Sequence, residues 1–393
     1  MLTNLPAATE DQTIESLVAT TCLRNPIPRW NDALKATFGD DKVRFNSALQ
    51  RGWKRAYEAF RDIGHESPEA FINAHSYLPI FKHALGSRGY ASLLQDVLAD
   101  RIRHLGFVSI NKVLRDGQSR FCQACVDTAV HDKGYACALR AHQILGVFVC
   151  PDHGLPLLHC QDTDRSIHSF LRKGIILPPF TLVLDASSQQ HDPSGASSCL
   201  EQRYAKFVQA ALRGRLATVS SSAFQDAIHS KLHVDGANSL SHESAVAWRL
   251  EHQVPPAIRA DIDAVISSSR SNWPLKVLDG SISKLHPLAS LLLITTVFAD
   301  ASEFNRYAER AENLRASHLR EIDQLRYGVN FEITHPPVET PDHASVLSIQ
   351  DKVARGRLIA ARTAAADILV AATDGDRALV NRVLACFIPD RVA

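Results

Sequence analysis

The sequence predicts a mainly α-helical, multi-domain protein with helix-turn-helix-like units and an embedded Cys3His zinc-finger segment. Three observations predict this class. Apolar residues recur at helical spacing along most of the chain, strand signals are few and short, and one segment concentrates cysteine, histidine and glycine. The chain has 393 residues, and domains usually hold roughly 100–200 residues. More than one folding unit is therefore expected.

We expect three regions, at 1–120, 121–160 and 161–393. The first is an N-terminal helical domain, the second a zinc-binding segment, and the third one or more C-terminal helical domains. Helix-turn-helix units are expected in the first region and around 205–235, because the helices predicted there are short and closely spaced.

Two local patterns predict helices in the first region. Trp53, Ala56 and Phe60 recur at helical spacing and form an apolar stripe. Ser67 followed by Pro68 is typical of a helix start, because serine caps the first turn and proline needs no backbone donor there.

The C-terminal region carries the clearest helix signals. The run 288–299, LASLLLITTVFA, is apolar but shorter than the roughly 20 residues of a membrane span, so it predicts a buried helix. The next helix is expected over 301–327. Asp300 is its predicted cap, Glu303 stands at the capping-box position, and Gly328 is expected to end it.

Composition excludes several classes of function. The 43 basic and 42 acidic residues give a net charge of +1, so the protein does not coat nucleic acid through bulk charge. There is no G-x-x-x-x-G-K-[ST] phosphate-binding loop and no G-x-S-x-G nucleophile elbow. Residues 1–12 show neither a basic n-region nor an apolar h-region, so no secretory signal is visible. We therefore expect a cytoplasmic, non-enzymatic protein with no membrane partner, whose eight cysteines are thiols or metal ligands.

Two pairs of residues predict a metal site. Cys122-Gln-Ala-Cys125 and Cys150-Pro-Asp-His153 are separated by residues 126–149. Each pair can form a tight turn with both ligands facing one ion, and three thiolates with one imidazole suit tetrahedral Zn²⁺. Four protein ligands leave no position for an activated water, so we expect one structural zinc. The alternative is two unrelated pairs of buried residues.

Two neighbouring residues bear on this site. Cys160 could belong to another pair of metal ligands, but the residues that follow it, Gln161 and Asp162, include no second cysteine. This favours a single metal ion and leaves a second one open. His142 is expected to orient a ligand rather than to bind the ion itself, because four better-spaced ligands already exist.

A pattern spanning about 35 residues surrounds the predicted metal ligands. It comprises the first cysteine pair, Gly134-Tyr135, Arg140-Ala-His142-Gln143, and Gly146-Val-Phe-Val-Cys150-Pro-Asp-His153-Gly154. This pattern resembles that of the TniQ/TnsD family of transposon target-selection proteins. Weaker similarities are Glu15-Ser-Leu, His75-Ser-Tyr-Leu-Pro-Ile-Phe and His286-Pro-Leu. The chain departs from the family pattern at Gln123, usually proline, and at Cys137, commonly an aromatic residue.

The resemblance implies an adaptor in bacterial transposition that performs no chemistry itself. Such a protein binds target DNA, or an RNA-guided complex already on DNA, and recruits an AAA+ ATPase regulator that brings in the transposase. It would be associated with the nucleoid. The length favours the shorter TniQ type. Whether DNA is read directly, and whether the chain forms a homodimer, stays open.

DNA contact would require basic side chains gathered on one surface. The candidates for such a surface fall in four groups along the chain: Arg51, Lys54 and Arg55; Arg101 and Arg103; Arg115 and Arg120; Arg203, Lys206, Arg213 and Arg215. Each group taken alone is more typical of a solvated helix face.

Two rival hypotheses remain from the sequence. One is a zinc-dependent nucleic-acid-modifying enzyme with an open metal position, although the H-x-E and P-C-x-x-C deaminase signature is absent. The other is a zinc-containing transcription regulator unrelated to transposons. Neighbouring genes for an AAA+ ATPase and a transposase would favour the adaptor.

Overall fold

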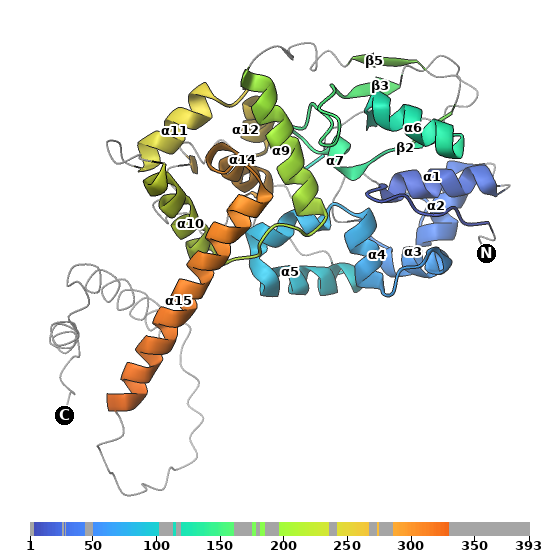
Figure 1. Cartoon of the computed structure of the whole chain (residues 1–393). Helices are drawn as coiled ribbons and strands as arrows, with labels where there is room; N and C mark the ends of the chain where they lie inside the picture. Colours follow the sequence, from blue (N-terminus) through green and yellow to red (C-terminus); the bar gives the residue numbers. More distant parts are fainter. Residues whose placement is uncertain are drawn as a thin grey trace, which may run out of the picture. The chain divides into compact units, whose positions relative to one another are not determined.

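A computed structural model describes the chain over residues 4–25, 27, 29–43, 50–101, 113–114, 119–160, 175–177, 181–184, 196–235, 242–266, 273–274 and 286–329. The chain divides into two units, 1–325 and 326–393, and the description below concerns the first. The described part is mainly helical, as the sequence predicts (Figure 1). The predictions at Arg103, at Arg115 and beyond residue 329 lie outside the described residues.

The N-terminal third consists of short helices. In chain order these are α1 (Ile14–Arg24), α2 (Trp30–Phe38), α3 (Trp53–Ala59), the 3-10 turn η1 (Arg61–Ile63), α4 (Pro68–His75), the 3-10 turn η2 (Leu78–Phe81) and α5 (Lys82–Leu98), which kinks at Gly86.

The middle of the chain carries the strands and two small helices. These are β1 (Arg120–Phe121), α6 (Gln123–Lys133), β2 (Ala136–Cys137), α7 (Arg140–Gln143), β3 (Leu158–Cys160), β4 (Ile175–Ile176) and β5 (Leu182–Leu184). One antiparallel sheet has the order β1-β3-β5, and β2 pairs with β4. In the first sheet Phe121 lies opposite Leu158, which in turn lies opposite Leu184.

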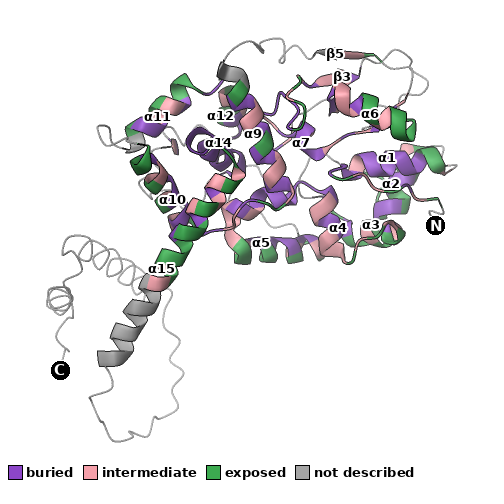
Figure 2. Cartoon of the chain, viewed as in Figure 1, coloured by how far each residue is buried: buried purple, intermediate pink, exposed green. Residues whose placement is uncertain are grey.

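The remaining helices surround an apolar centre. They are α9 (Ala196–Leu212), α10 (Ser221–Val234), α11 (His242–His252), α12 (Pro256–Val265), α14 (Pro287–Val297) and α15 (Ala301–Val329). Every residue of α14 is buried, which confirms the helix expected over 288–299 (Figure 2). A helix that is apolar on all sides must lie inside the protein, and α14 packs against α9, α10 and α11.

No single described helix is long and apolar enough to cross a membrane. Among the described helices, only α14 and residues 301–317 of α15 together have the length and composition of a span, and they are bent by 102° at the break between them.

The predicted helix starts are confirmed at atomic detail. The Ser67 hydroxyl accepts from the Ala70 amide, and Trp53, Ala56 and Phe60 are buried. At the start of α15, the Asp300 carboxylate accepts from the Glu303 amide at 2.8 Å. This helix runs one residue past Gly328, within the usual uncertainty of helix ends.

The predicted boundaries at 120/121 and 160/161 fall inside one unit. A single apolar cluster includes Ile14 of α1, Cys150 beside the predicted metal site and Ala311 of α15. A second, smaller cluster surrounds Phe121 and Val126. Residues from all three predicted regions therefore contribute to one apolar cluster, and the domain boundaries themselves stay a prediction. The helix-turn-helix character of the short helices stays a prediction.

Buried histidine makes stability depend on pH. His83 on α5 is buried against α14, where its Nε2 lies 2.5 Å from the Ser290 hydroxyl. Burial lowers the pKa of His83 to about 4. The unfolded chain binds a proton near pH 6.5 and the folded chain does not, so stability falls as pH drops from about 6.5 towards 4.

Between pH 7.5 and 5.5, His83 is expected to reduce the free energy of unfolding by about 1 kcal/mol. Urea unfolding of the wild type and of His83→Gln at both pH values measures this effect. The variant loses the buried titrating group, so its stability should change less over the interval. Equal pH dependence in the two proteins would contradict the assignment.

Candidate metal centre

The four predicted ligands converge. The sulfur atoms of Cys122, Cys125 and Cys150 and a ring nitrogen of His153 all lie within 4.8 Å of one another. His153 presents Nδ1, which is 3.6 Å from Cys122 Sγ, 3.3 Å from Cys125 Sγ and 3.5 Å from Cys150 Sγ. The two sulfurs of Cys125 and Cys150 are 3.7 Å apart.

These spacings fit one tetrahedral ion. Bonds of about 2.3 Å to sulfur and about 2.0–2.1 Å to nitrogen place two sulfurs about 3.8 Å apart, and sulfur and nitrogen about 3.6 Å apart. These four separations lie close to both values, and all the donor atoms lie within 4.8 Å of one another. The Cys3His cluster can therefore hold one metal ion.

Local structure positions the first pair. Cys122 is the N-cap of α6, and its carbonyl accepts from the Val126 amide at 3.0 Å. Cys125 follows in the first turn. The amide groups and the dipole at a helix N-terminus favour negative charge, so this position stabilises thiolates.

A tight hairpin positions the second pair. The Leu157 amide donates to Phe148 O at 2.8 Å, and the Cys150 amide donates to Leu155 O at 2.8 Å. Gly154 closes the turn with φ +68°, and its amide donates to Cys150 O at 2.8 Å. Most side chains are strained at this φ, so glycine suits the turn.

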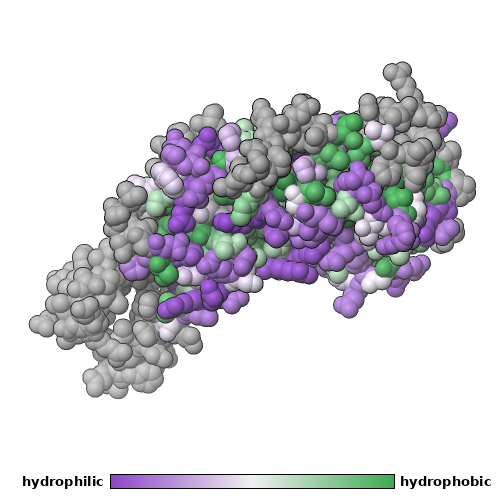
Figure 3. Space-filling model, turned by 45° about the horizontal axis from the view of Figure 1, so that its top comes forward, coloured by the Kyte–Doolittle hydropathy of each residue, from purple (hydrophilic) through white to green (hydrophobic). Residues whose placement is uncertain are grey.

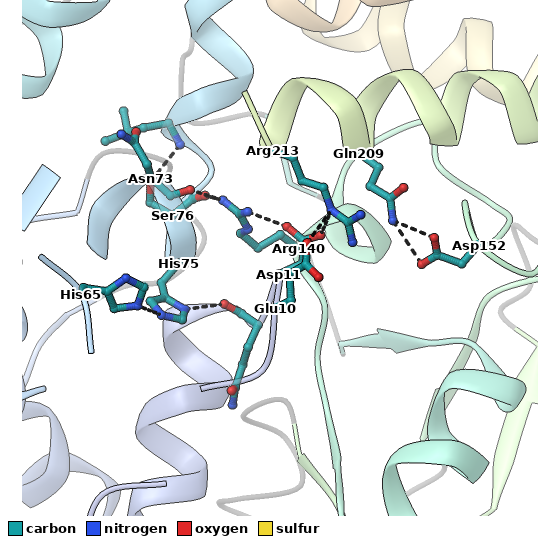
Figure 4. A network of polar contacts seen from close by, with 12 residues as sticks. Glu10, Asp11, His65, Asn73, His75, Ser76, Arg140, Asp152, Gln209 and Arg213 are labelled. Atoms are coloured by element: carbon teal, nitrogen blue, oxygen red, sulfur yellow. Dashed lines mark hydrogen bonds and ion pairs between the residues drawn. The ribbon is translucent and has the colours of Figure 1, made fainter. Parts of the chain in front are cut away.

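The β1–β3 pairing joins the two pairs of ligands. β1 directly precedes Cys122, and β3 directly follows the hairpin, so their antiparallel register places both turns at one end of the sheet. The Asp152 carboxylate also accepts from the Gln209 amide of α9 at 3.1 Å, which attaches the hairpin to the helical body (Figure 4).

The three thiols compete for their protons. Hydrogen bonding from Cys125 and Cys150 lowers the pKa of Cys122, while the bond to Cys122 raises the pKa of Cys125 and brings that of Cys150 to about 11. One thiolate therefore suppresses ionisation of the next. A divalent cation offsets this repulsion, which is the electrostatic reason that such a cluster favours a metal.

His142 lies beside the cluster but is not part of it. Its side chain is 2% exposed, and burial lowers its pKa to about 4. Cys122 is the neighbouring charge that most favours its protonated form. Its buried Nε2 makes no hydrogen bond within the described structure. The predicted role in orienting a ligand stays a prediction.

Arg120 is a correction to the predicted DNA contacts. Its side chain is buried, and its guanidinium donates to the carbonyls of Val147 at 2.5 Å and Ile144 at 2.8 Å. Its backbone exchanges two hydrogen bonds with the Gln143 amide. Arg120 therefore fixes the loop before the hairpin and cannot reach a phosphate.

The other predicted basic residues divide by exposure. Arg203 is half-buried and donates to Thr295 O, and Arg213 binds Asp11. Arg101 is exposed and pairs with Asp96. The remaining described candidates are exposed: Arg51, Lys54, Arg55, Lys206 and Arg215. Hydrophilic side chains predominate on the described surface visible in Figure 3, with smaller apolar areas between them.

Sequence reasoning missed a polar network at Asp11. The Asp11 carboxylate accepts from Arg140 Nη2 and from Arg213 Nε, each at 2.5 Å. Arg140 Nη1 also donates to the carbonyls of Asn73 and Ser76 (Figure 4). Asp11 has φ +60°, an unusual conformation for a residue other than glycine. Nothing in the local sequence identifies partners so far apart in the chain.

Cys160 lies on β3 in the smaller apolar cluster, and no second metal-ligand group forms among the described residues. No protein-family model matches this sequence, and no curated protein is significantly similar to it.

Proposed function

We propose that this protein is a zinc-containing target-selection adaptor of bacterial transposition. It binds target DNA or a DNA-bound guide complex and recruits an AAA+ regulator and a transposase. The observation that carries the proposal is the shared location of the resembling residues. Three parts of the resembling motif lie together in the larger apolar cluster: the Cys3His cluster, the Arg140–Gln143 turn and the 148–157 hairpin.

The donor set supports zinc in a structural role. Three thiolates and an imidazole suit zinc better than hard cations, which prefer oxygen ligands. Four protein donors would complete the tetrahedral coordination shell of a zinc ion, which would leave no position for a metal-activated water. This favours the adaptor over a zinc-dependent enzyme.

The polar residues of the resembling motif have structural partners. Arg140 joins α7 to Asp11 and to the carboxyl end of α4, while Gln143 joins α7 to β1. These bonds attach the metal segment to the N-terminal helices through Arg140 and to β1 through Gln143.

Arg51, Lys54 and Arg55 are the best candidates for contact with DNA. All three are exposed at and before α3, and none forms an ion pair with another described residue. Phosphate contacts require free cations, because each neutralised phosphate releases a condensed counterion. Arg203 and Arg213 are already engaged, which makes the fourth predicted group less suitable.

The test is binding of the metal-loaded protein to duplex DNA at two salt concentrations. The duplexes are random sequence and the sequence flanking its gene. We expect affinity to fall with salt and to fall further when Arg51, Lys54 and Arg55 are all changed to glutamine. The matched control changes the exposed residues Arg88, Arg306 and Arg310 to glutamine and should bind as the wild type does.

Each outcome bears on the proposal. Preference for the flanking duplex means that the protein reads DNA itself. Weak, sequence-blind binding assigns recognition to a guide complex, and co-purification with the AAA+ regulator then becomes the deciding measurement. Absence of both DNA binding and a regulator complex would exclude the adaptor. A transcription regulator is favoured if the bound sequence is a promoter and no ATPase or transposase gene lies nearby.

A further inference from the structure

A cleft opens beside the Asp11 network, away from the metal ligands. Segment 8–11, α4 and the turn 212–215 after α9 line it, and its volume is about 620 Å³. Small-molecule sites usually measure about 300–1,000 Å³. The cleft is therefore large enough to admit a small ligand.

Positive charge exceeds negative charge at the base of this cleft. Asp11 supplies one buried carboxylate, whereas Arg140 and Arg213 supply two guanidinium groups. Glu10 Oε1 approaches Arg213 Nε at 3.5 Å, but the Glu10 side chain is 71% exposed. Water screens such an exposed carboxylate, so it compensates the second cation only weakly.

Of the two guanidinium groups, that of Arg140 is the more buried and the less completely hydrogen-bonded. Its side chain is 3% exposed, and its Nε has no hydrogen-bond partner in the described structure. Two of its other bonds go to neutral carbonyls, at Asn73 and Ser76. Burial therefore lowers the pKa of Arg140. A buried cation that shares its counter-ion is stabilised by a further anion nearby.

Two more cations line the cleft. Lys82 at the start of α5 and Arg215 after α9 both face it, and neither side chain pairs with a carboxylate of the described chain. Arg213 lies between α9 and Asp11, with 22% of its side chain exposed. Cations from two separate elements thus converge on one space.

The two histidines of the cleft add no charge at neutral pH. His75 Nδ1 donates to Gln12 O at 2.9 Å, so His75 Nε2 accepts from His65 Nε2, also at 2.9 Å (Figure 4). Burial lowers the pKa of both rings, that of His75 to about 4. The excess charge therefore belongs to the lysine and arginines.

We propose that this cleft is a binding site for the oxyanion of a small molecule, a carboxylate or a phosphate. The anion contacts Lys82 and Arg215 and offsets the excess charge of the Asp11 network, in which Arg213 is bound to Asp11. Apolar lining from Ile63 and Leu212 contacts the remainder of the ligand. The inference is independent of the proposed role in transposition, because no residue of the metal centre or of the α3 basic group takes part.

The test measures thermal unfolding and isothermal titration with inorganic phosphate and, separately, with acetate, at constant ionic strength set with sodium chloride. A saturable rise in melting temperature is expected with at least one anion. The Lys82→Gln/Arg215→Gln variant should bind about tenfold more weakly, because two charge-assisted contacts are lost. Arg88→Gln, an exposed change on α5 outside the cleft, should bind as the wild type does.

Neither Lys82 nor Arg215 forms an ion pair with a described residue, so the double variant should fold normally. Its melting temperature without added anion checks this. Binding of phosphate alone assigns a phosphorylated ligand, binding of acetate alone assigns a carboxylate, and binding of both supports a site that accepts either oxyanion. The proposal is overturned if neither anion binds saturably, or if the double variant and Arg88→Gln respond alike.

Discussion

Replacement of Cys150 by serine is expected to abolish metal binding and to destabilise the protein severely. Cys150 is fully buried in the main core, and its sulfur lies 3.7 Å from that of Cys125. In zinc-finger peptides the apparent binding free energy is about 10–16 kcal/mol and appears as folding free energy. Losing one of four ligands forfeits much of that contribution.

The measurement is metal content by elemental analysis together with urea unfolding. The wild type should contain one zinc per chain, and Cys150→Ser much less than one. A strong chelator should shift the wild-type curve towards that of the variant. Cys125→Ser should behave in the same way, because its sulfur also contacts His153 Nδ1.

Cys199→Ser is the matched control. Cys199 is exposed on α9 and does not belong to the metal-ligand cluster. Its metal content and unfolding curve should equal those of the wild type. Full metal content and unchanged unfolding in Cys150→Ser would refute the ligand assignment. If elemental analysis finds iron or another ion, the ligand assignment stands and the identity of the metal is corrected.

Replacement of Asp11 by asparagine is expected to cost about 3–5 kcal/mol, the range observed when one partner of a buried ion pair is removed. The substitution keeps the size of the side chain and removes the charge that Arg140 and Arg213 share. Arg140 then stays buried as an uncompensated cation. The N-terminal segment would also lose its side-chain ion pairs with Arg140 of α7 and with Arg213 after α9, although the backbone bond from the Arg140 amide to Asp11 O remains.

Glu10→Gln is the adjacent control. Glu10 is adjacent in sequence, and its replacement also removes one carboxylate charge. Its side chain is 71% exposed, and its Oε1 lies 3.5 Å from Arg213 Nε, farther than the 2.5 Å of Asp11 Oδ2. Exposed pairs contribute about 0–1 kcal/mol. Urea unfolding should therefore separate the two variants by several kcal/mol, and equal stabilities would show that the Asp11 network is not a significant contributor.

The Asp11 network also gives a physical reason for part of the resembling motif. Arg140 lies in a single helical turn whose side chains point in different directions. Arg140 reaches Asp11, His142 lies beside Cys122, and Gln143 bonds the backbone of Arg120. One turn of four residues therefore links the N-terminal helices, the metal cluster and β1, which explains how a short motif organises a large core.

The sequence by itself determined the features that depend on neighbours a few residues apart. Cys122 and Cys125 lie within one turn of chain, Ser67 caps the helix that starts beside it, and the apolar run at 288–299 must be buried whatever surrounds it. These signals arise from hydrogen bonds and side-chain spacing over one or two turns, so the local order of residues is sufficient to reveal them.

Only the tertiary structure decided which residues meet across the chain. Arg120 and the exposed Arg215 are indistinguishable as basic residues in sequence, yet one is buried against carbonyls and the other faces solvent. Asp11 meets Arg140 and Arg213 because α1, α7 and α9 pack around a common core. Burial and ion pairing depend on how distant segments cross, and no local pattern records that crossing.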